Sequence, residues 1–395
     1  MDPLALYIHV PFCQHKCIYC DFYSTTRTGL LPRYLAALQQ EIAFYQHSRL
    51  FAGRTLSSIY WGGGTPSLIA PEALSPLMAT ITAVWPLLPD AEITLEANPG
   101  ALDIGHLAGY RRAGINRLSL GIQSFDDREL HLLTRIHSAA DARTAIAAAR
   151  NAGFANLSLD LIFGLPGQSL AGYTDSVNRA LASRPEHLSL YGLTVESGTP
   201  LARAVARGEL QTCPEEEERE MYLRGKELLE STGYGHYEIS NYSLPGRESR
   251  HNQHYWSSLA YLGLGPAAHS FAGGERWWNN RDLGSYLAAW ERHESAVAGR
   301  EILGREEERI EAVMLGLRCS SGIDLDRWRE RFGEPFLERN ARALKQLGGM
   351  ATGSPPFAAT AGEELLTRNG AHLALTRSGL LLYDLVCREL CAGLQ

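Results

Sequence analysis

Long apolar runs are missing from this sequence, as are the features of a secretory signal. A membrane-spanning helix needs about 20 consecutive apolar residues, and no stretch of the 395-residue chain approaches that length. The first residues, MDPLALYIHVPFC, have neither a basic segment nor a long apolar segment. We therefore expect no transmembrane segment and a cytoplasmic location.

The chain also lacks an excess of positive charge. Its 37 lysines and arginines are outnumbered by 44 aspartates and glutamates, which gives a formal net charge of −7. Proteins that bind nucleic acid usually carry a concentrated basic surface. Nucleic acid is therefore not an expected partner.

Cysteine is scarce and odd in number, with seven residues in the whole chain. A chain of this length does not depend on disulfides, so the odd count favours a reducing compartment with metal-binding or buried thiols. Three of the seven, Cys13, Cys17 and Cys20, nevertheless lie within eight positions. That crowding needs a chemical reason.

The sequence does contain a regular alternation of short runs rich in Ile, Val, Leu and Tyr with longer amphipathic stretches. The expected strands are residues 4–10, 56–62, 91–97, 116–124, 156–164 and 187–195. The clearest helices are residues 32–46, 70–85 and 139–153. Six βα units in series predict an α/β fold whose parallel sheet closes fully or partly into a barrel, with ligands at the carboxyl ends of the strands.

Beyond about residue 200 this alternation changes. The acidic run at 214–220 opens a predicted helix, 235–243 is a predicted strand, and 249–271 crowds His, Trp, Tyr and Gly into an irregular region. Further on, a helix is predicted over 305–319, and a strand leading into a helix over 371–390. We expect three segments, which are a core barrel at 1–200, a barrel extension at 201–299 and a smaller α+β domain at 300–395.

Unusual residues follow the predicted strands. WGGGTP follows the second strand, EANPG ends the third, QSF ends the fourth and DLIFGLPGQS ends the fifth. A glycine triplet after a strand is more often a turn than a site, but glycine also lets the backbone approach a ligand closely. Because the carboxyl ends of parallel strands meet at one edge, these motifs predict one site there.

The CxxxCxxC spacing supplies too many thiols for a lone nucleophile and one too few for a closed structural zinc site, which takes four ligands. A fourth ligand from elsewhere in the chain would complete such a zinc site. Three thiolates could instead hold three irons of a [4Fe-4S] cluster, whose usual ligands are four cysteines. The fourth iron would then be open to a small molecule.

With these motifs the chain resembles the radical S-adenosylmethionine (SAM) superfamily. The resemblance implies that Cys13, Cys17 and Cys20 bind a [4Fe-4S] cluster in a loop after the first strand, and that SAM chelates the open iron. It also implies a partial (βα)6 barrel of the TIM-like type. In that superfamily an electron from the cluster cleaves SAM to a 5′-deoxyadenosyl radical, so the cofactors carry the difficult chemistry and the protein holds them.

The motifs YIHVPFC, WGGGTP, EANP, GIQSF and DLIFGLPGQ resemble, in order, those of a narrower branch that contains oxygen-independent coproporphyrinogen III oxidase (HemN) and the HemW-type haem chaperones. That resemblance implies nine SAM contacts, which are Tyr7, Tyr19, Gly63, Gly64, Thr65, Glu96, Gln123, Arg135 and Asp160. Glu96 and Asp160 could accept hydrogen bonds from amino or ribose hydroxyl groups, and Arg135 could grip a carboxylate. Each of the nine could also be a structural residue.

Two features separate the members of this branch. The oxidases carry a fourth cysteine two positions after the third, where this chain has Phe22. Residues 250–256, RHNQHYW, resemble the HNxxYW signature of the haem chaperones. Imidazole is a natural axial ligand for haem iron, so His251 is the leading candidate ligand, with His254 and His269 as alternatives. The structural alternative for His251 is a hydrogen-bonded histidine beside buried aromatics.

Residues 306–318 and 322–325 further resemble the start of that branch's carboxy-terminal domain. The whole resemblance implies a haem chaperone that binds haem, a [4Fe-4S] cluster and SAM and passes haem to acceptor apoproteins, membrane-bound respiratory enzymes among them. Peripheral association with a membrane and a homodimer both stay open. So do two alternatives, the radical decarboxylation of coproporphyrinogen III and a zinc-stabilised binding module. The residues do not say whether SAM is cleaved.

Overall fold

The computed structural model describes residues 2–350 and 364–394. The chain forms two compact units. The first contains Met1–Gly235, Ser240–His251 and Ala260–Glu301, and the second contains His236–Ile239, Asn252–Leu259 and Ile302–Gln395. The three-part division expected from the sequence stays a prediction, and its residues 1, 351–363 and 395 lie outside the described ones.

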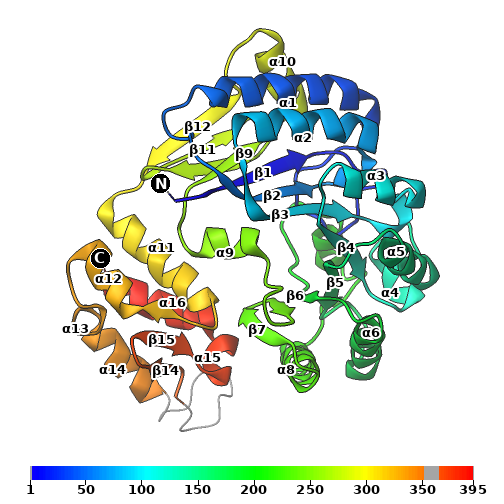
Figure 1. Cartoon of the computed structure of the whole chain (residues 1–395). Helices are drawn as coiled ribbons and strands as arrows, with labels where there is room; N and C mark the ends of the chain where they lie inside the picture. The colour runs from blue at the N-terminus through cyan, green and yellow to red at the C-terminus, as the bar shows by residue number, and fades with distance from the viewer. Residues whose placement is uncertain (1, 351–363, 395) are drawn as a thin grey trace. The chain divides into compact units, whose positions relative to one another are not determined.

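Six parallel strands form the centre of the first unit (Figure 1), where they pair in chain order. They are β1 (Leu4–Val10), β2 (Leu56–Gly63), β3 (Leu87–Ala97), β4 (Arg117–Gln123), β5 (Leu157–Phe163) and β6 (His187–Gly192). Each neighbouring pair from β1 to β6 is parallel. The predicted α/β fold with six strand–helix repeats is confirmed.

Helices cover the outer face of these strands, and α1 and α2 lie side by side over β1 to β3 (Figure 1). They are α1 (Leu31–Gln46), α2 (Pro71–Val84), α3 (Leu107–Arg112), α4 (Asp127–Leu132), α5 (Ala139–Asn151) and α6 (Leu170–Ala182). Short 3-10 turns lie at Thr28–Leu30, Pro66–Leu68, Pro99–Ala101 and Ile104–His106. Local chemistry sets the helix starts: α5 begins after Ser138, whose hydroxyl caps Asp141 N while the Asp141 side chain accepts from Ser138 N.

Alternate residues of the six strands face opposite ways. In β1, Leu4, Leu6 and Ile8 are fully buried in the core that also contains the apolar faces of α1 and α2. Tyr7 and His9 lie on the other face, inside the barrel. The interior is polar, and its buried members include Ser58, Glu92, Thr94, Arg117, Ser119, Ser158, His187 and Ser189. Apolar side chains therefore pack between the strands and the surrounding helices, whereas polar side chains occupy the interior of the barrel.

The chain after β6 adds strands on both sides of these six. After α7 (Pro200–Ala206) and α8 (Glu215–Ser231), the expected strand at 235–243 is split into β7 (Gly235–Glu238) and β8 (Asn241–Ser243), and β8 pairs with β6. The expectation that 249–271 is irregular is wrong. That segment forms α9 (Arg250–Trp256), β9 (Tyr261–Leu264) and β10 (His269–Ala272), because β9 pairs in parallel with β1 and β10 folds back on β9. Next come β11 (Glu275–Asn279), α10 (Leu283–Glu291) and β12 (Val297–Ile302).

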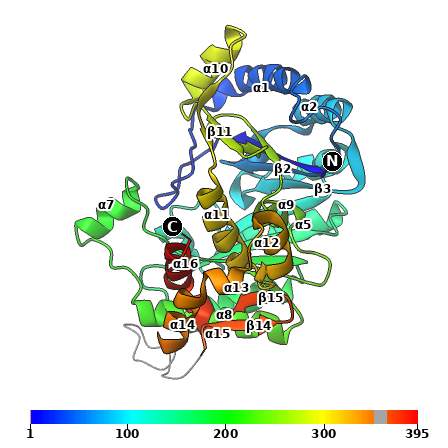
Figure 2. The same ribbon diagram turned by 90° about the vertical axis from the view of Figure 1, so that its left-hand side faces the viewer.

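The second unit has its own core and mixes helices with a small sheet (Figure 2). Its elements are α11 (Arg305–Arg318), β13 (Ile323–Asp324), α12 (Leu325–Phe332), α13 (Phe336–Arg339), α14 (Ala341–Met350), β14 (Leu366–Asn369), β15 (His372–Leu375), α15 (Arg377–Leu381) and α16 (Tyr383–Ala392). The predicted helix at 305–319 and the predicted strand and helix at 371–390 are confirmed. Among the described helices of the chain, none is long and apolar enough to span a bilayer.

Candidate functional site

The cysteine loop, residues 11–25, leaves the carboxyl end of β1 and is closed at its base by backbone hydrogen bonds. Thr25 N donates to Pro11 O at 2.7 Å, and Cys13 N donates to Thr25 O at 3.0 Å. Farther along the loop, Tyr23 Oη accepts from Leu283 N at 2.6 Å. These ties hold the three cysteines at the end of β1, where the sequence predicted the site.

The three thiols share one electrostatic environment. Cys17 is buried, and Cys13 and Cys20 are partly exposed. Burial raises the pKa of the Cys13 and Cys20 thiols, and the neighbouring cysteines raise it further. Thr65 Oγ1 lies 3.5 Å from Cys13 Sγ, and Arg135 Nη1 lies 3.6 Å from Cys17 Sγ. Such donors favour thiolates, the form that binds metal, so this donor set fits a [4Fe-4S] cluster.

A zinc site and an iron–sulfur cluster differ in how their ligands are arranged. Within residues 2–350 and 364–394, no group of three or more His, Cys, Asp or Glu side chains could hold a metal ion. Zinc ligands converge on one ion, whereas three cysteines of a cluster bind three different irons. Three thiols that do not converge on one point are thus compatible with the cluster.

The glycine segment, which is residues 62–64 at the end of β2, packs against the start of the cysteine loop. Gly64 N donates to Val10 O at 2.8 Å. Gly63 has a φ of +109°, and a Cβ at this position would lie 2.7 Å from the His9 ring. Both the backbone conformation and the close approach therefore require glycine here.

Glu96, near the end of β3, accepts two hydrogen bonds from β2. Tyr60 Oη donates to Oε1 at 2.7 Å, and Gly63 N donates to Oε2 at 3.1 Å. Burial raises the pKa of Glu96 to about 7 against the lowering effect of these bonds, and the charge of Asp160 also raises it. A cationic amino group beside Glu96 would favour its ionised form, which fits the predicted contact with SAM.

His9 sets the direction of the Tyr7 hydroxyl. Burial lowers the pKa of His9 to about 4, so its imidazole is neutral. Nε2 lies 2.9 Å from Tyr23 O, a carbonyl that can only accept, so Nε2 carries the proton. Nδ1 then accepts from Tyr7 Oη at 3.0 Å. Toward any further partner, the Tyr7 oxygen is therefore an acceptor.

Arg135 connects the end of β4 with the cysteine loop. Its Nη2 donates to Gly121 O at 2.7 Å, in addition to the contact with Cys17. Its Nε is buried and has no hydrogen-bond partner among the described residues, so the guanidinium keeps a donor for a bound carboxylate. Gln123, the last residue of β4, has a φ of 68°. Such a conformation is uncommon for a non-glycine residue and is concentrated at functional sites.

Asp160 and Tyr19 complete the predicted set. Ser119 Oγ lies 3.2 Å from Asp160 Oδ2, and Ser158 Oγ lies 3.5 Å from Oδ1. Burial raises the pKa of Asp160. Tyr19 packs against a small apolar cluster that contains Ile162.

The nine predicted SAM contacts come from β1 to β5, the loops that follow them and the cysteine loop. All except Thr65 remain partly exposed, although most strand residues around them are buried. Partial exposure at the open end of a barrel, an unpartnered guanidinium nitrogen and a glycine with positive φ all suit a bound small molecule. Their role as SAM contacts stays a prediction.

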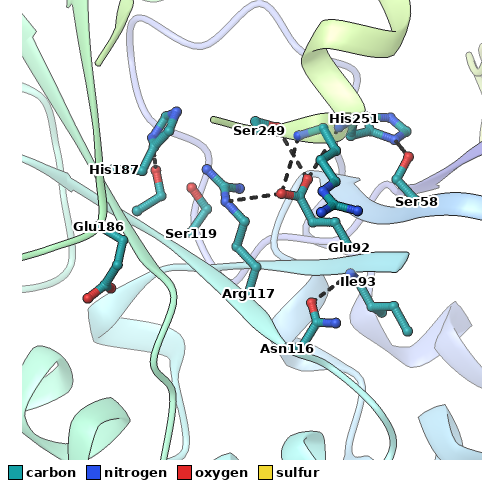
Figure 3. A network of polar contacts seen from close by, with 12 residues as sticks. Ser58, Glu92, Ile93, Asn116, Arg117, Ser119, Glu186, His187, Ser249 and His251 are labelled. Atoms are coloured by element: carbon teal, nitrogen blue, oxygen red, sulfur yellow. Dashed lines mark hydrogen bonds and ion pairs between the residues drawn. The ribbon is translucent and has the colours of Figure 1, made fainter. Parts of the chain in front are cut away.

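The side chain of His251, in the first turn of α9, points into the barrel interior (Figure 3). Its Nδ1 is 2.9 Å from Ser58 Oγ. Its ring stacks on that of Tyr60, with centroids 5.0 Å apart and an interplanar angle of 27°. The residue is only 1% exposed. His251 therefore lies beside the tyrosine that donates to Glu96.

The alternative histidines lie in different surroundings. His254 is buried. His269 is exposed on β10 and stacks on Trp278, with ring centroids 5.7 Å apart. Burial lowers the pKa of His269. All three assignments as haem ligands stay predictions.

Sequence reasoning missed a buried charge network inside the barrel (Figure 3). Glu92 and Arg117 are 6% and 2% exposed, with 3.9 Å between carboxylate oxygen and Nε. Glu92 also accepts from the start of α9, since Arg250 N and His251 N each lie 3.3 Å away and Ser249 Oγ lies 3.4 Å away. The sequence signal for this network is one charged residue at an inward-facing position of β3, Glu92, and one at an inward-facing position of β4, Arg117. Buried charges require partners, so two such residues on neighbouring strands indicate a pair.

Comparison with known proteins gives the family. Residues 7–180 match the radical SAM superfamily, and residues 303–382 match the HemN C-terminal domain. The heme chaperone HemW of Synechocystis sp. is 40% identical over 331 residues, which are 81% of this chain and 79% of that protein. The heme chaperone HemW of Mycobacterium tuberculosis is 38% identical over 393 residues, which are 98% of this chain and 95% of that protein.

A solved structure supports the same relationship. Coproporphyrinogen III oxidase (HemN) from Escherichia coli, a radical SAM enzyme, matches with a TM-score of 0.83 and 25% sequence identity over 99% of this chain and 90% of that chain. The predicted fold and branch are therefore confirmed, including the carboxy-terminal domain. The chain belongs to the HemW heme chaperone family, within the radical SAM superfamily.

Proposed function

We propose that this protein binds a [4Fe-4S] cluster, SAM and one haem, and that it passes the haem to acceptor apoproteins. The single observation that carries the proposal is the position of His251, an imidazole in the HNxxYW helix that lies against the tyrosine bonded to Glu96. The names of the relatives support a haem cargo, because proteins 38% and 40% identical to this chain are named heme chaperones.

In this proposal the barrel end holds the cofactors. Cys13, Cys17 and Cys20 bind three irons, and SAM covers the fourth. A bound cluster and SAM together supply one-electron chemistry. Glu96 would accept a hydrogen bond from the amino group of SAM, and Arg135 would donate one to its carboxylate.

His251 is the proposed axial ligand for the haem iron. Its ring is 1% exposed where it lies between Ser58 and Tyr60, and haem is too large to reach a nitrogen buried in this way. The first turn of α9 must therefore leave the barrel interior before the iron can bind. We place transfer in the cytoplasm, with membrane-bound respiratory enzymes as one class of acceptor.

An anaerobic haemin titration of cluster-reconstituted protein, followed by the Soret band, tests this proposal. We expect saturation near one haem per chain and a weakening of about tenfold or more in His251→Ala, because the variant lacks the proposed iron ligand; tenfold in Kd corresponds to about 1.4 kcal/mol. His254→Ala and His269→Ala test the two alternative ligands, and with His251 as the ligand both should bind haem as the native protein does. Absence of saturable binding in the native protein would contradict the chaperone function.

A second candidate is oxygen-independent coproporphyrinogen III oxidase, favoured by the structural similarity to HemN. Phe22 argues against it, since the oxidases carry a cysteine at that position. Anaerobic turnover of coproporphyrinogen III by the native protein, with reductant and SAM, would establish the oxidase and displace the first proposal.

A further inference from the structure

Tyr60 touches both the predicted SAM site and the predicted haem ligand. Its hydroxyl donates to Glu96 Oε1 at 2.7 Å, and its ring stacks on His251 at 5.0 Å between centroids. Tyr7, another predicted SAM contact, lies near the same pair, with its ring centroid 6.3 Å from those of Tyr60 and of His251. A short chain of side chains thus leads from one site to the other.

We propose that Tyr60 couples the two sites, so that SAM bound beside Glu96 keeps His251 inside the barrel and weakens haem binding. The inference rests on the proposed function, because it takes His251 as the haem ligand. It makes Tyr60 a positioning residue, which acts through Glu96 and His251.

The inward position of His251 is one of two states that the coupling requires. Several contacts stabilise it, since Ser58 Oγ is 2.9 Å from Nδ1 and Glu92 Oε1 is 3.3 Å from His251 N. Haem binds only the outward state, in which Nε2 can reach the iron. A ligand that stabilises the inward state must therefore oppose haem.

SAM is such a ligand because its amino group is cationic. A cation beside Glu96 favours the carboxylate, and a carboxylate is a stronger acceptor for the Tyr60 hydroxyl than a neutral acid. The stronger bond fixes Tyr60 in the orientation that stacks on His251. Since Glu96 also accepts from Gly63 N, the glycine segment that packs against the cysteine loop is part of the same unit.

Coupling of this kind has a definite size and is reciprocal. Allosteric coupling commonly changes affinities by about 5- to 150-fold, and one aromatic contact with one hydrogen bond belongs at the lower end. We expect saturating SAM to raise the haem Kd by about fivefold, and haem to raise the SAM Kd by the same factor.

The test is an anaerobic haemin titration of the cluster-reconstituted full chain, without reductant, in the presence and absence of SAM. Tyr60→Phe keeps the ring and loses the hydroxyl, so its haem Kd should be the same with and without SAM. Tyr234→Phe is the matched control, because it removes another buried tyrosine hydroxyl, the donor to Pro185 O, and should keep the native response. A native haem Kd that SAM leaves unchanged or lowers would overturn the coupling, as would a full SAM effect in Tyr60→Phe.

Hydrogen exchange gives a readout that needs no haem. SAM should slow amide exchange in the first turn of α9 in the native protein and in Tyr234→Phe, and should leave it unchanged in Tyr60→Phe. Equal protection in all three proteins, or in none, would overturn the coupling. If SAM protects α9 as expected but no saturable haemin binding appears, the helix contact stands and the haem function fails, so the two failures are distinguishable.

Discussion

Replacing Glu92 by glutamine should release α9 and tighten haem binding, although Glu92 is not among the proposed haem ligands. The Glu92 carboxylate lies inside the barrel and accepts from Ser249 Oγ, Arg250 N and His251 N at the start of the helix (Figure 3). These contacts hold His251 in its inward position. A change that weakens them shifts the equilibrium toward the outward state, which is the proposed iron-binding state.

The magnitude follows from the geometry. Glutamine keeps one acceptor oxygen and places an NH2 group where the other was, so Arg250 N or His251 N loses its acceptor. A buried donor left without its partner costs about 1–3 kcal/mol, and the 3.3 Å lengths of these bonds place the loss near the lower end. About 1 kcal/mol corresponds to an apparent haem Kd lower by up to about fivefold, if the native protein is mostly in the inward state.

The assay is haemin titration of Glu92→Gln beside the native protein, with thermal unfolding of both. Glu41→Gln is the matched control, because Glu41 is a fully buried carboxylate that accepts from Gly265 N and Tyr286 Oη, away from α9. We expect both variants to lose stability and only Glu92→Gln to gain haem affinity. An unchanged or weaker haem affinity in a folded Glu92→Gln protein would refute the reasoning that His251 must leave the barrel.

Three further predictions concern the cofactor end and the core. Gly63→Ala should lower SAM affinity about tenfold or more in equilibrium dialysis, because its Cβ would collide with the His9 ring 2.7 Å away and its φ of +109° suits only glycine; native affinity would contradict this. Cys17→Ser should retain little iron and sulfide after reconstitution, whereas Cys213→Ser, which changes a thiol outside the cysteine loop, should keep the native content; equal contents would remove Cys17 from the ligand set. Burial raises the pKa of Glu41 from about 4.5 to about 7, so the folded chain holds this proton more tightly than the unfolded chain. The contribution of this protonated carboxyl to the free energy of unfolding is therefore complete below pH ~4.5 and is lost as the pH rises through about 7. Glutamine does not titrate, so the unfolding midpoint of Glu41→Gln should rise relative to that of the native protein between pH 5 and 8. A difference between the two midpoints that stays constant over this range would contradict the raised pKa.

The repeating part of the fold could be predicted because its signals are local. The strands at 4–10 and 156–164 were expected almost where β1 and β5 occur, since β-branched and leucine-rich runs are bounded by turn residues. The location of the candidate site could be predicted from the same pattern, because motifs that follow parallel strands converge at their carboxyl ends. The cysteine loop and the contact of Glu96 with the glycine segment both lie there.

Other parts could not be predicted because their cause is non-local. All four residues of β9 pair with Ala5–Ile8, more than 250 positions earlier. Likewise, Glu92 shows its role only when the start of α9 comes within 3.3 Å. A seven-residue helix such as α9 has little stability of its own. It therefore depends on tertiary contacts such as those with Glu92, which its local sequence does not reveal.

The boundary between the two compact units runs through α9, between His251 and Asn252. In the second unit the guanidinium carbon of Arg318 lies 4.3 Å above the Trp256 ring, and Arg327 Nη2 donates to Ser257 O at 3.2 Å. A truncated protein that ends at residue 301 would still contain the whole HNxxYW signature, but its tryptophan would lose these supports. Trp256 of the signature therefore depends on residues that follow the barrel in the chain, and haem binding should be measured on the full-length protein.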